Sequence, residues 1–140
     1  MKRNFKLISA IVFAMLLSVF CLVSCKKDGY AKASLVSADE NQVVILVDES
    51  KDGTLLDAME YLQEAGALSY TLSGTMMESI NGKANGNNSF WMLYTSDSEM
   101  ANTSWGTVEY NGATFGSAIL GADALEAVAG EYYVWVYTVF

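Results

Sequence analysis

One continuous apolar run and one amphipathic segment mark the first regular elements of the chain. Residues 43–47 read VVILV, and a short run rich in β-branched residues is typical of a buried strand. Leu55, Met59 and Leu62 then share one helix face at the i, i+4, i+7 spacing. The pattern predicts a helix over residues 54–65, which begins with a capping-box-like TLLD and ends before a glycine.

After the predicted helix the pattern changes to strands and turns. Asn-Gly pairs at 81–82 and 111–112 predict tight hairpins, because both positions tolerate positive φ. Residues 124–128 stay ambiguous. One strand, one helix and then a series of strands indicate an α+β fold, and we expect a β-grasp-like mixed sheet covered by one helix, with added β-hairpins. The later strand signals cover residues 68–72, 76–80, 90–94, 108–115 and 132–140.

The N-terminal residues have the composition of an export signal. Three basic residues lie at its start, an apolar stretch follows, and residues 22–25 read LVSC. A small residue directly before a cysteine is the pattern of lipoprotein processing, in which the cysteine is acylated and becomes the new N-terminus. We expect Cys25 to be the lipidation site. The alternative is an uncleaved membrane-spanning helix, for which an apolar stretch of about 18 residues is at the short limit.

Both interpretations place the rest of the chain outside the cytoplasm. We expect a lipoprotein signal peptide over residues 1–24, a lipidated tether over 25–42 and one domain over 43–140. About 115 residues after the signal are enough for one core and too few for two. The expected protein is exported, lipid-anchored to the cell membrane and faces outside the cytoplasm.

The charge of the part expected to be exported limits the kinds of partner that it can bind. All 16 acidic residues follow Cys25, against five lysines and no arginine, which gives a formal net charge of −11. Such a surface repels nucleic acid and anionic lipid headgroups, so we expect no nucleic-acid partner. Solubility at the cell envelope is the preferred explanation of the acidity, and a specific cation site is the alternative.

The sequence has few of the residue types that catalytic sites use. The chain has no histidine, so neither a Ser–His or Cys–His pair nor a histidine-ligated zinc or haem site can form. We expect no enzyme activity, no cofactor and no metal site. Residues 48–53 resemble the start of an EF-hand loop, but its position 12 is Met59 instead of glutamate. We interpret them as a solvated turn, with weak surface calcium binding by Asp48 and Asp52 as the alternative.

Aromatic residues are the remaining candidates for function. Alternation along residues 90–94 places Trp91 and Leu93 on one face of a strand and the other three side chains on the opposite face. One helix covers only one face of a sheet, so one of these sets should be exposed, and an exposed apolar set often marks an interface. We take Trp91, Leu93 and Trp105 as the candidate ligand-binding residues, with a place in the core as the alternative for each tryptophan.

Four segments, taken in order, resemble a known family. They are similar to the C-terminal domain of transcobalamin and intrinsic factor, and to bacterial lipoprotein domains like it, over roughly residues 43–140. The matching segments are residues 53–59 (GTLLDAM), 79–82 (SING), 90–94 (FWMLY) and 134–137 (VWVY).

The resemblance carries expectations about fold and ligand. It implies a β-grasp-like sheet with one helix, and it implies that Trp91 and Leu93, in the matched Trp-x-Leu strand, contact a corrinoid-like ligand. Two features differ from the animal proteins: this chain shows no counterpart of their helical partner domain, and residues 105–115 read as an added hairpin.

These observations lead to two functional hypotheses. The first is a membrane-anchored, non-catalytic ligand-binding module, with a corrinoid-like small molecule as the candidate ligand. The alternative is a protein-interaction module of a cell-envelope assembly, in which an exposed aromatic strand adds to the sheet edge of a partner. A small-ligand site requires a concave pocket, whereas a protein site requires a flat patch or an open edge strand.

Overall fold

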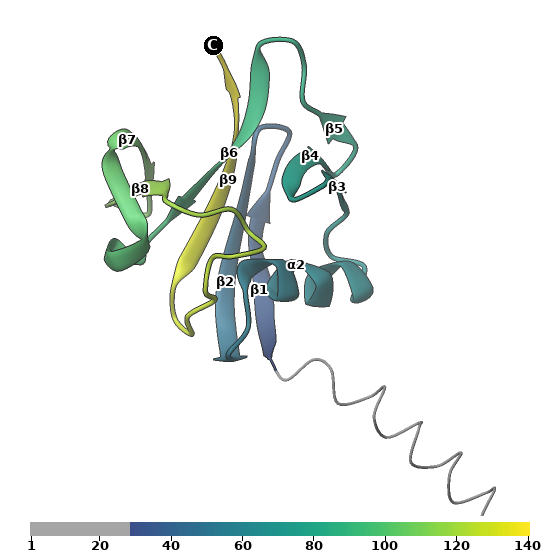
Figure 1. Cartoon of the computed structure of the whole chain (residues 1–140), viewed down its shortest axis with the longest axis vertical. Coiled ribbons are helices and arrows are strands. Elements are labelled where there is room, and N and C mark those ends of the chain that lie inside the picture. Colours follow the sequence, from purple (N-terminus) through teal and green to yellow (C-terminus); the bar gives the residue numbers. More distant parts are fainter. Residues whose placement is uncertain (1–28) are drawn as a thin grey trace, which may run out of the picture.

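The computed structural model describes residues 29–140, which form an α+β fold with one α-helix. The expected signal peptide and Cys25 lie outside the described residues. Six strands form a large sheet in the order β1-β2-β9-β6-β8-β7, and β3, β4 and β5 form a small second sheet (Figure 1). The elements are β1 (Tyr30–Ala38), β2 (Gln42–Lys51), α2 (Leu55–Glu64), β3 (Tyr70–Ser73), β4 (Met76–Ile80), β5 (Lys83–Ala84), β6 (Ser89–Thr95), the 3-10 helix η1 (Ser98–Met100), β7 (Ala101–Tyr110), β8 (Ala113–Ala118) and β9 (Tyr132–Val139).

The sheet and its first strand correct two expectations. Every pairing between neighbouring strands of the two sheets is antiparallel, so the prediction of a mixed sheet is wrong. The expectation of a tether over 25–42 is wrong for Tyr30–Ala38, which form the edge strand β1, paired with β2. The buried positions of β1 are Ala31 and Ala33, whose small side chains leave room for α2 and give little hydrophobic signal in the sequence.

The first predicted strand and the predicted helix are both confirmed. β2 runs on to Lys51, because β1 continues the pairing as far as Tyr30 opposite Lys51, so most of the turn expected at 48–53 is strand. At the start of α2, the Thr54 hydroxyl accepts from the Asp57 N–H at 3.3 Å, and Asp57 Oδ2 accepts from the Thr54 N–H at 2.9 Å. This reciprocal capping box satisfies two backbone donors that the helix leaves free.

The two Asn-Gly hairpins are confirmed as well. Asn81 and Gly82 have φ values of 49° and 81°, and Asn111 and Gly112 have φ values of 53° and 79°. Positive φ at both central residues is what a tight two-residue turn requires, and asparagine and glycine meet it at low cost. The turns join β4 to β5 and β7 to β8.

The connecting segment between β8 and β9, residues 119–131, resolves the ambiguous stretch 124–128. It lies outside the named helices and strands and is bonded to the start of α2: the Leu55 N–H donates to the Leu125 carbonyl at 2.8 Å, and the Ala127 N–H donates to the Gly53 carbonyl at 2.9 Å. Leu125 and Ala127 are buried. The connecting segment therefore covers part of the core next to the start of α2.

The core has one part on each face of the large sheet. On the first face, side chains of β2, β6 and β9 pack with α2, the small sheet and the connecting segment. On the second face, Val44 and Val134 pack with Phe115 and with partly buried aromatic residues. In Figure 1, α2 and β3–β5 lie to one side of the long strands and the β7–β8 hairpin to the other. On the face without a helix, the β7–β8 hairpin covers Val44 and Val134. Among residues 29–140, no helix combines the length and apolar character needed to cross a membrane.

Candidate functional site

The predicted alternation along β6 is confirmed, and the structure decides which face is which. Trp91 and Leu93 are only 6% and 8% exposed and belong to the core of the first face. Phe90, Met92 and Tyr94 are more exposed and point to the opposite side. Of the two arrangements that the sequence left open, Trp91 and Leu93 are therefore the core-facing set.

Although Trp91 and Leu93 are largely buried, both line an open cleft of about 380 Å³. Trp135 lines the same cleft and lies opposite Leu93 in the pairing of β6 with β9. Met92 of β6 also borders the cleft, and the β3–β4 hairpin contributes Leu72, Thr75, Met76 and Met77. The end of β8 and the connecting segment contribute Ser117, Ala118, Gly121, Ala122 and Asp123. Four separate parts of the chain thus enclose the cleft over the centre of the sheet.

The Trp91 side chain is held in place by polar and aromatic contacts. Its Nε1–H donates to the Lys83 carbonyl at 2.8 Å, and its backbone N–H donates to Asn85 Oδ1 at 3.0 Å. The Tyr137 ring meets the indole edge-on at 5.3 Å between ring centroids, and Lys83 Nζ lies 4.1 Å from the centroid of the Tyr137 ring. Contacts of this kind fix an aromatic side chain in one orientation. Trp91 therefore forms a rigid side of the cleft.

Trp135 differs from Trp91 in one respect. It is 5% exposed, and within the described part of the chain its Nε1–H is buried without a hydrogen-bond acceptor. A buried donor left unpaired costs about 1–3 kcal/mol of stability. Two indoles therefore line one cleft, one with its donor satisfied and the other with its donor unpaired.

The polar groups of the cleft are few. The lining includes the hydroxyls of Thr75 and Ser117 and the carboxylate of Asp123, and it contains no lysine or arginine. Among residues 29–140, no three acidic, histidine or cysteine side chains are grouped so as to hold a metal ion. The cleft offers apolar contact area and a small number of hydrogen-bonding groups, which is the composition of a binding site for a small molecule.

Trp105, the third candidate from the sequence, is not among the residues that line the cleft. It lies in the edge strand β7 and is 64% exposed. The pairing of β7 with β8 shifts register between Asn102 and Thr107, so Trp105 is in an irregular part of the strand. Gly106 has a φ of 143°, which a residue with a side chain rarely adopts. The structure brings Trp91 and Leu93 together and separates Trp105 from them.

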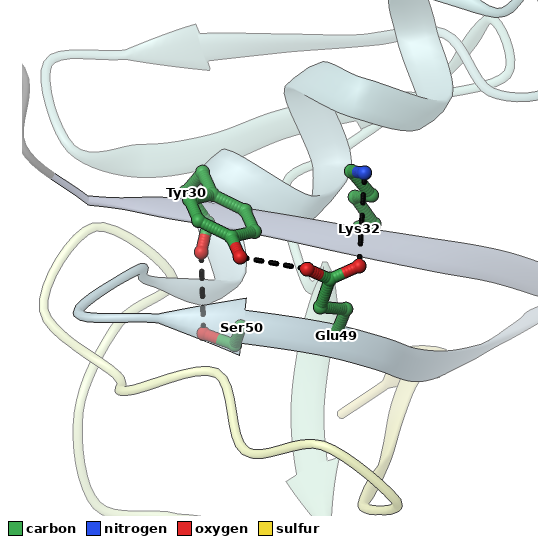
Figure 2. Close-up of polar contacts among 4 residues, drawn as sticks. All are labelled: Tyr30, Lys32, Glu49 and Ser50. Carbon is green, nitrogen blue, oxygen red and sulfur yellow. Dashed lines mark hydrogen bonds and ion pairs between the residues drawn. The ribbon is translucent and has the colours of Figure 1, made fainter.

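A second group of polar contacts joins the first described strand to β2 (Figure 2). The Tyr30 hydroxyl donates to Glu49 Oε1 at 2.7 Å, Lys32 Nζ lies 3.6 Å from Glu49 Oε2, and Ser50 Oγ donates to the Tyr30 carbonyl at 3.3 Å. The bond to Glu49 raises the pKa of Tyr30, and the same bond together with Lys32 lowers the pKa of Glu49. The group is exposed, and we interpret these contacts as stabilising the pairing of β1 with β2.

Sequence reasoning missed Trp135 and the β3–β4 hairpin as parts of the site. A signal for Trp135 was present, since alternation along 132–140 places it on one face with Tyr133 and Tyr137. The register that puts Trp135 opposite Leu93 was not available from local pattern.

Comparisons of the chain with protein-family models, with curated proteins and with solved structures give no match. The resemblance to the transcobalamin C-terminal domain therefore stays a prediction.

Proposed function

We propose that this protein is a lipid-anchored, exported, non-catalytic module that binds a small molecule in the cleft beside Trp91, Leu93 and Trp135. The observation that carries the proposal is an open, largely apolar cleft that Trp91, Leu93 and Trp135 line from the central strands of the large sheet. A concave, largely apolar site with few polar groups is the usual form of a small-ligand site. We assign no catalytic role, because the lining provides contact surface and hydrogen bonds but no nucleophile paired with a base.

A β-grasp-like fold and a corrinoid-like ligand belong to this proposal as its more specific form. The helix on one face of the sheet and the matched Trp-x-Leu strand in the cleft support it. A volume of about 380 Å³ lies near the lower end of small-molecule sites. The cleft therefore suits one edge or side group of a corrinoid, with the rest of the ring system outside it.

The proposed anchor places the domain close to the membrane. Cys25 precedes the start of β1 at Tyr30 by five residues, and a fully extended chain of that length spans at most about 18 Å. Replacing Cys25 with alanine should release the protein from membranes or leave an unprocessed precursor, as measured by fractionation and by the mass of the N-terminal peptide. A variant that stays membrane-bound and is cut at the same place would contradict the anchor.

The binding proposal is tested by thermal unfolding of residues 26–140 with corrinoids, haem, sugars and divalent cations. A ligand that binds only the folded state raises the melting temperature, and the shift grows with the ratio of ligand concentration to dissociation constant. Met76 lines the cleft and is 65% exposed, so Met76→Glu should abolish the shift without loss of folding. Val139→Glu, at a similarly exposed position outside the cleft, is the matched control and should keep the shift. A shift unaffected by Met76→Glu would place the ligand elsewhere.

A second candidate function rests on β7. This strand lies at an edge of the large sheet and exposes Trp105, and a partner protein could add a strand there with the indole as an anchor. The aromatic strand β6 is a poorer candidate for this role, since it lies between β9 and β8. If this second function holds, Trp105→Ala should abolish capture of an envelope protein and leave the thermal shifts unchanged.

A further inference from the structure

The charge on the lining of the cleft restricts the kind of ligand that it takes. We infer that the part of the ligand that enters the cleft is an organic cation. Its apolar body lies beside Trp91, Leu93 and Trp135, and its positively charged group pairs with the Asp123 carboxylate. This inference rests on the proposed binding function and adds the class of ligand to it.

Asp123 is the one ionised side chain among the residues that line the cleft. It lies at an exposed position of the connecting segment, and within the described part of the chain its carboxylate takes part in no hydrogen bond or ion pair. A Cβ placed on Gly121, which also lines the cleft, would lie 3.0 Å from Asp123 Oδ1. The carboxylate therefore lies against the lining and is free to accept a hydrogen bond from a ligand.

The turn that carries Asp123 is held in place by backbone hydrogen bonds. Within the turn, the Leu125 N–H donates to the Gly121 carbonyl at 2.8 Å. The Ala122 carbonyl accepts from the Leu56 N–H at 2.9 Å, so the turn is also bonded to the start of α2. A charged group on a turn that is already ordered loses little freedom when a ligand pairs with it, and this favours binding.

No lysine or arginine of residues 29–140 lines the cleft to compensate the charge of Asp123. The lysines of this part of the chain lie outside the lining: Lys32, Lys51 and Lys83. The sequence after Cys25 carries 16 acidic residues against five lysines. The field of the domain therefore attracts cations to the cleft and repels anions such as carboxylates and phosphates.

The rest of the lining suits an organic cation better than a metal ion. Trp91, Leu93 and Trp135 give contact area to a hydrocarbon or aromatic body, and indole rings attract organic cations through their electron-rich faces. Among residues 29–140, no three acidic, histidine or cysteine side chains are grouped so as to hold a metal ion. A two-ring aromatic amine is therefore a suitable probe for a cleft of about 380 Å³.

Three naphthalenes that differ in one substituent separate the charge of a ligand from its shape: 2-(aminomethyl)naphthalene, 2-(hydroxymethyl)naphthalene and 2-naphthoate. At neutral pH the first is a cation, the second is uncharged and the third is an anion. Dissociation constants are measured by equilibrium dialysis with residues 26–140, whose cooperative unfolding is checked first. Attraction to an exposed carboxylate and repulsion from it are each worth about threefold, so the cation should bind about tenfold more tightly than the anion, with the uncharged probe between them.

A single substitution assigns this order to Asp123. Asp123→Asn keeps the size of the side chain and removes its charge. It should weaken the cation about threefold, tighten the anion by a similar factor and leave the uncharged probe unchanged. Glu126→Gln, at an exposed acidic position of the same segment outside the cleft lining, is the matched control and should leave all three constants nearly unchanged. Should Asp123→Asn fail to fold, the order of the three probes in the natural protein still decides the ligand class.

The outcomes distinguish failure of the ligand class from failure of the binding function. If the anion binds as tightly as the cation, or if the uncharged probe binds more tightly than the cation, the inferred class is wrong and the binding function stands. The class is also wrong if Asp123→Asn lowers stability without changing the order of the probes, because the carboxylate would then serve the N-terminus of α2. If none of the three probes binds, the small-molecule function itself is overturned, and the ligand class with it.

Discussion

The two faces of the large sheet are covered in different ways, and the cleft beside Trp91 and Trp135 lies on the first face. The second face is covered by the β7–β8 hairpin, which belongs to the sheet itself. There the rings of Tyr110, Phe115 and Tyr132 pack together, with 5.7–6.3 Å between ring centroids. The first face is covered by α2, the small sheet and the connecting segment, and the cleft opens between the last two.

The way each face is covered explains why the cleft lies on the first face. A cover that is continuous with the sheet is placed by strand pairing, so its side chains close over the face beneath. A cover made of separate pieces meets the sheet at several places and leaves space at a junction. In this protein the junction lies over Trp91 and Trp135, the two indoles of the first face.

The largest effect should come from breaking the cover of the first face. Leu62 is buried between α2 and the sheet, and Leu62→Asp places a charge there without a partner. We expect a loss of at least about 4 kcal/mol in the free energy of unfolding, measured in urea. Tyr61→Asp, at the exposed neighbouring position, should cost less than about 0.5 kcal/mol. Similar values for the two variants would mean that α2 does not pack as described.

The next effect separates neighbours on the two faces of β6. Trp91→Ala removes a buried side chain of the first face and should cost about 3–5 kcal/mol. Met92→Ala removes a half-exposed side chain and should cost about 1 kcal/mol. Both values come from thermal or urea unfolding. The reverse order would place Met92 in the core and Trp91 on the exposed side.

A smaller effect depends on pH and concerns the connecting segment. The Tyr133 hydroxyl donates to the Glu126 carbonyl and accepts from the Val128 N–H, each at 2.9 Å, and burial raises the pKa of Tyr133 to about 12. Since this pKa lies above the usual value of 10.0, the folded state favours the neutral phenol. Its contribution is complete below pH 10 and is lost as the pH rises towards 12.

The measurement is the difference in unfolding free energy between the natural protein and Tyr133→Phe as the pH is raised. The difference should shrink by up to about 2 kcal/mol between pH 10 and pH 12. A constant difference for Tyr133→Phe would contradict the raised pKa.

The smallest effect compares the two indoles of the cleft. Trp91→Phe removes a satisfied hydrogen bond and leaves the Lys83 carbonyl without that donor, whereas Trp135→Phe removes a donor that has no partner. Trp91→Phe should therefore be about 1 kcal/mol more destabilising than Trp135→Phe. An equal or larger loss for Trp135→Phe, measured in the same urea series, would show that its Nε1–H is satisfied in solution.

Local chemistry in the sequence was sufficient to predict part of the fold. The capping box at Thr54, the apolar face of α2 and the two Asn-Gly turns each depend on a few neighbouring residues, and all are confirmed. The strand β1 escaped prediction because its buried residues are alanines, which give a weak apolar signal.

The site itself depended on long-range pairing, which local pattern does not determine. Alternation separated Trp91 from Met92 correctly, but it could not tell which face the hairpin would cover. The partners that complete the cleft come from three distant parts of the chain, and Trp135 reaches Leu93 only through the register of β6 with β9.

The most direct test of a binding cleft at Trp91 and Trp135 uses the three indole N–H signals of the chain in a nitrogen-15 NMR spectrum, assigned by single substitutions. A neutral two-ring aromatic compound, 2-acetylnaphthalene, is used as the probe because the cleft lining is largely apolar, and it is titrated into labelled residues 26–140. We expect the signals of Trp91 and Trp135 to move and reach saturation, while the signal of the exposed Trp105 stays in place. Movement of the Trp105 signal alone, or no movement of any signal, would contradict this expectation.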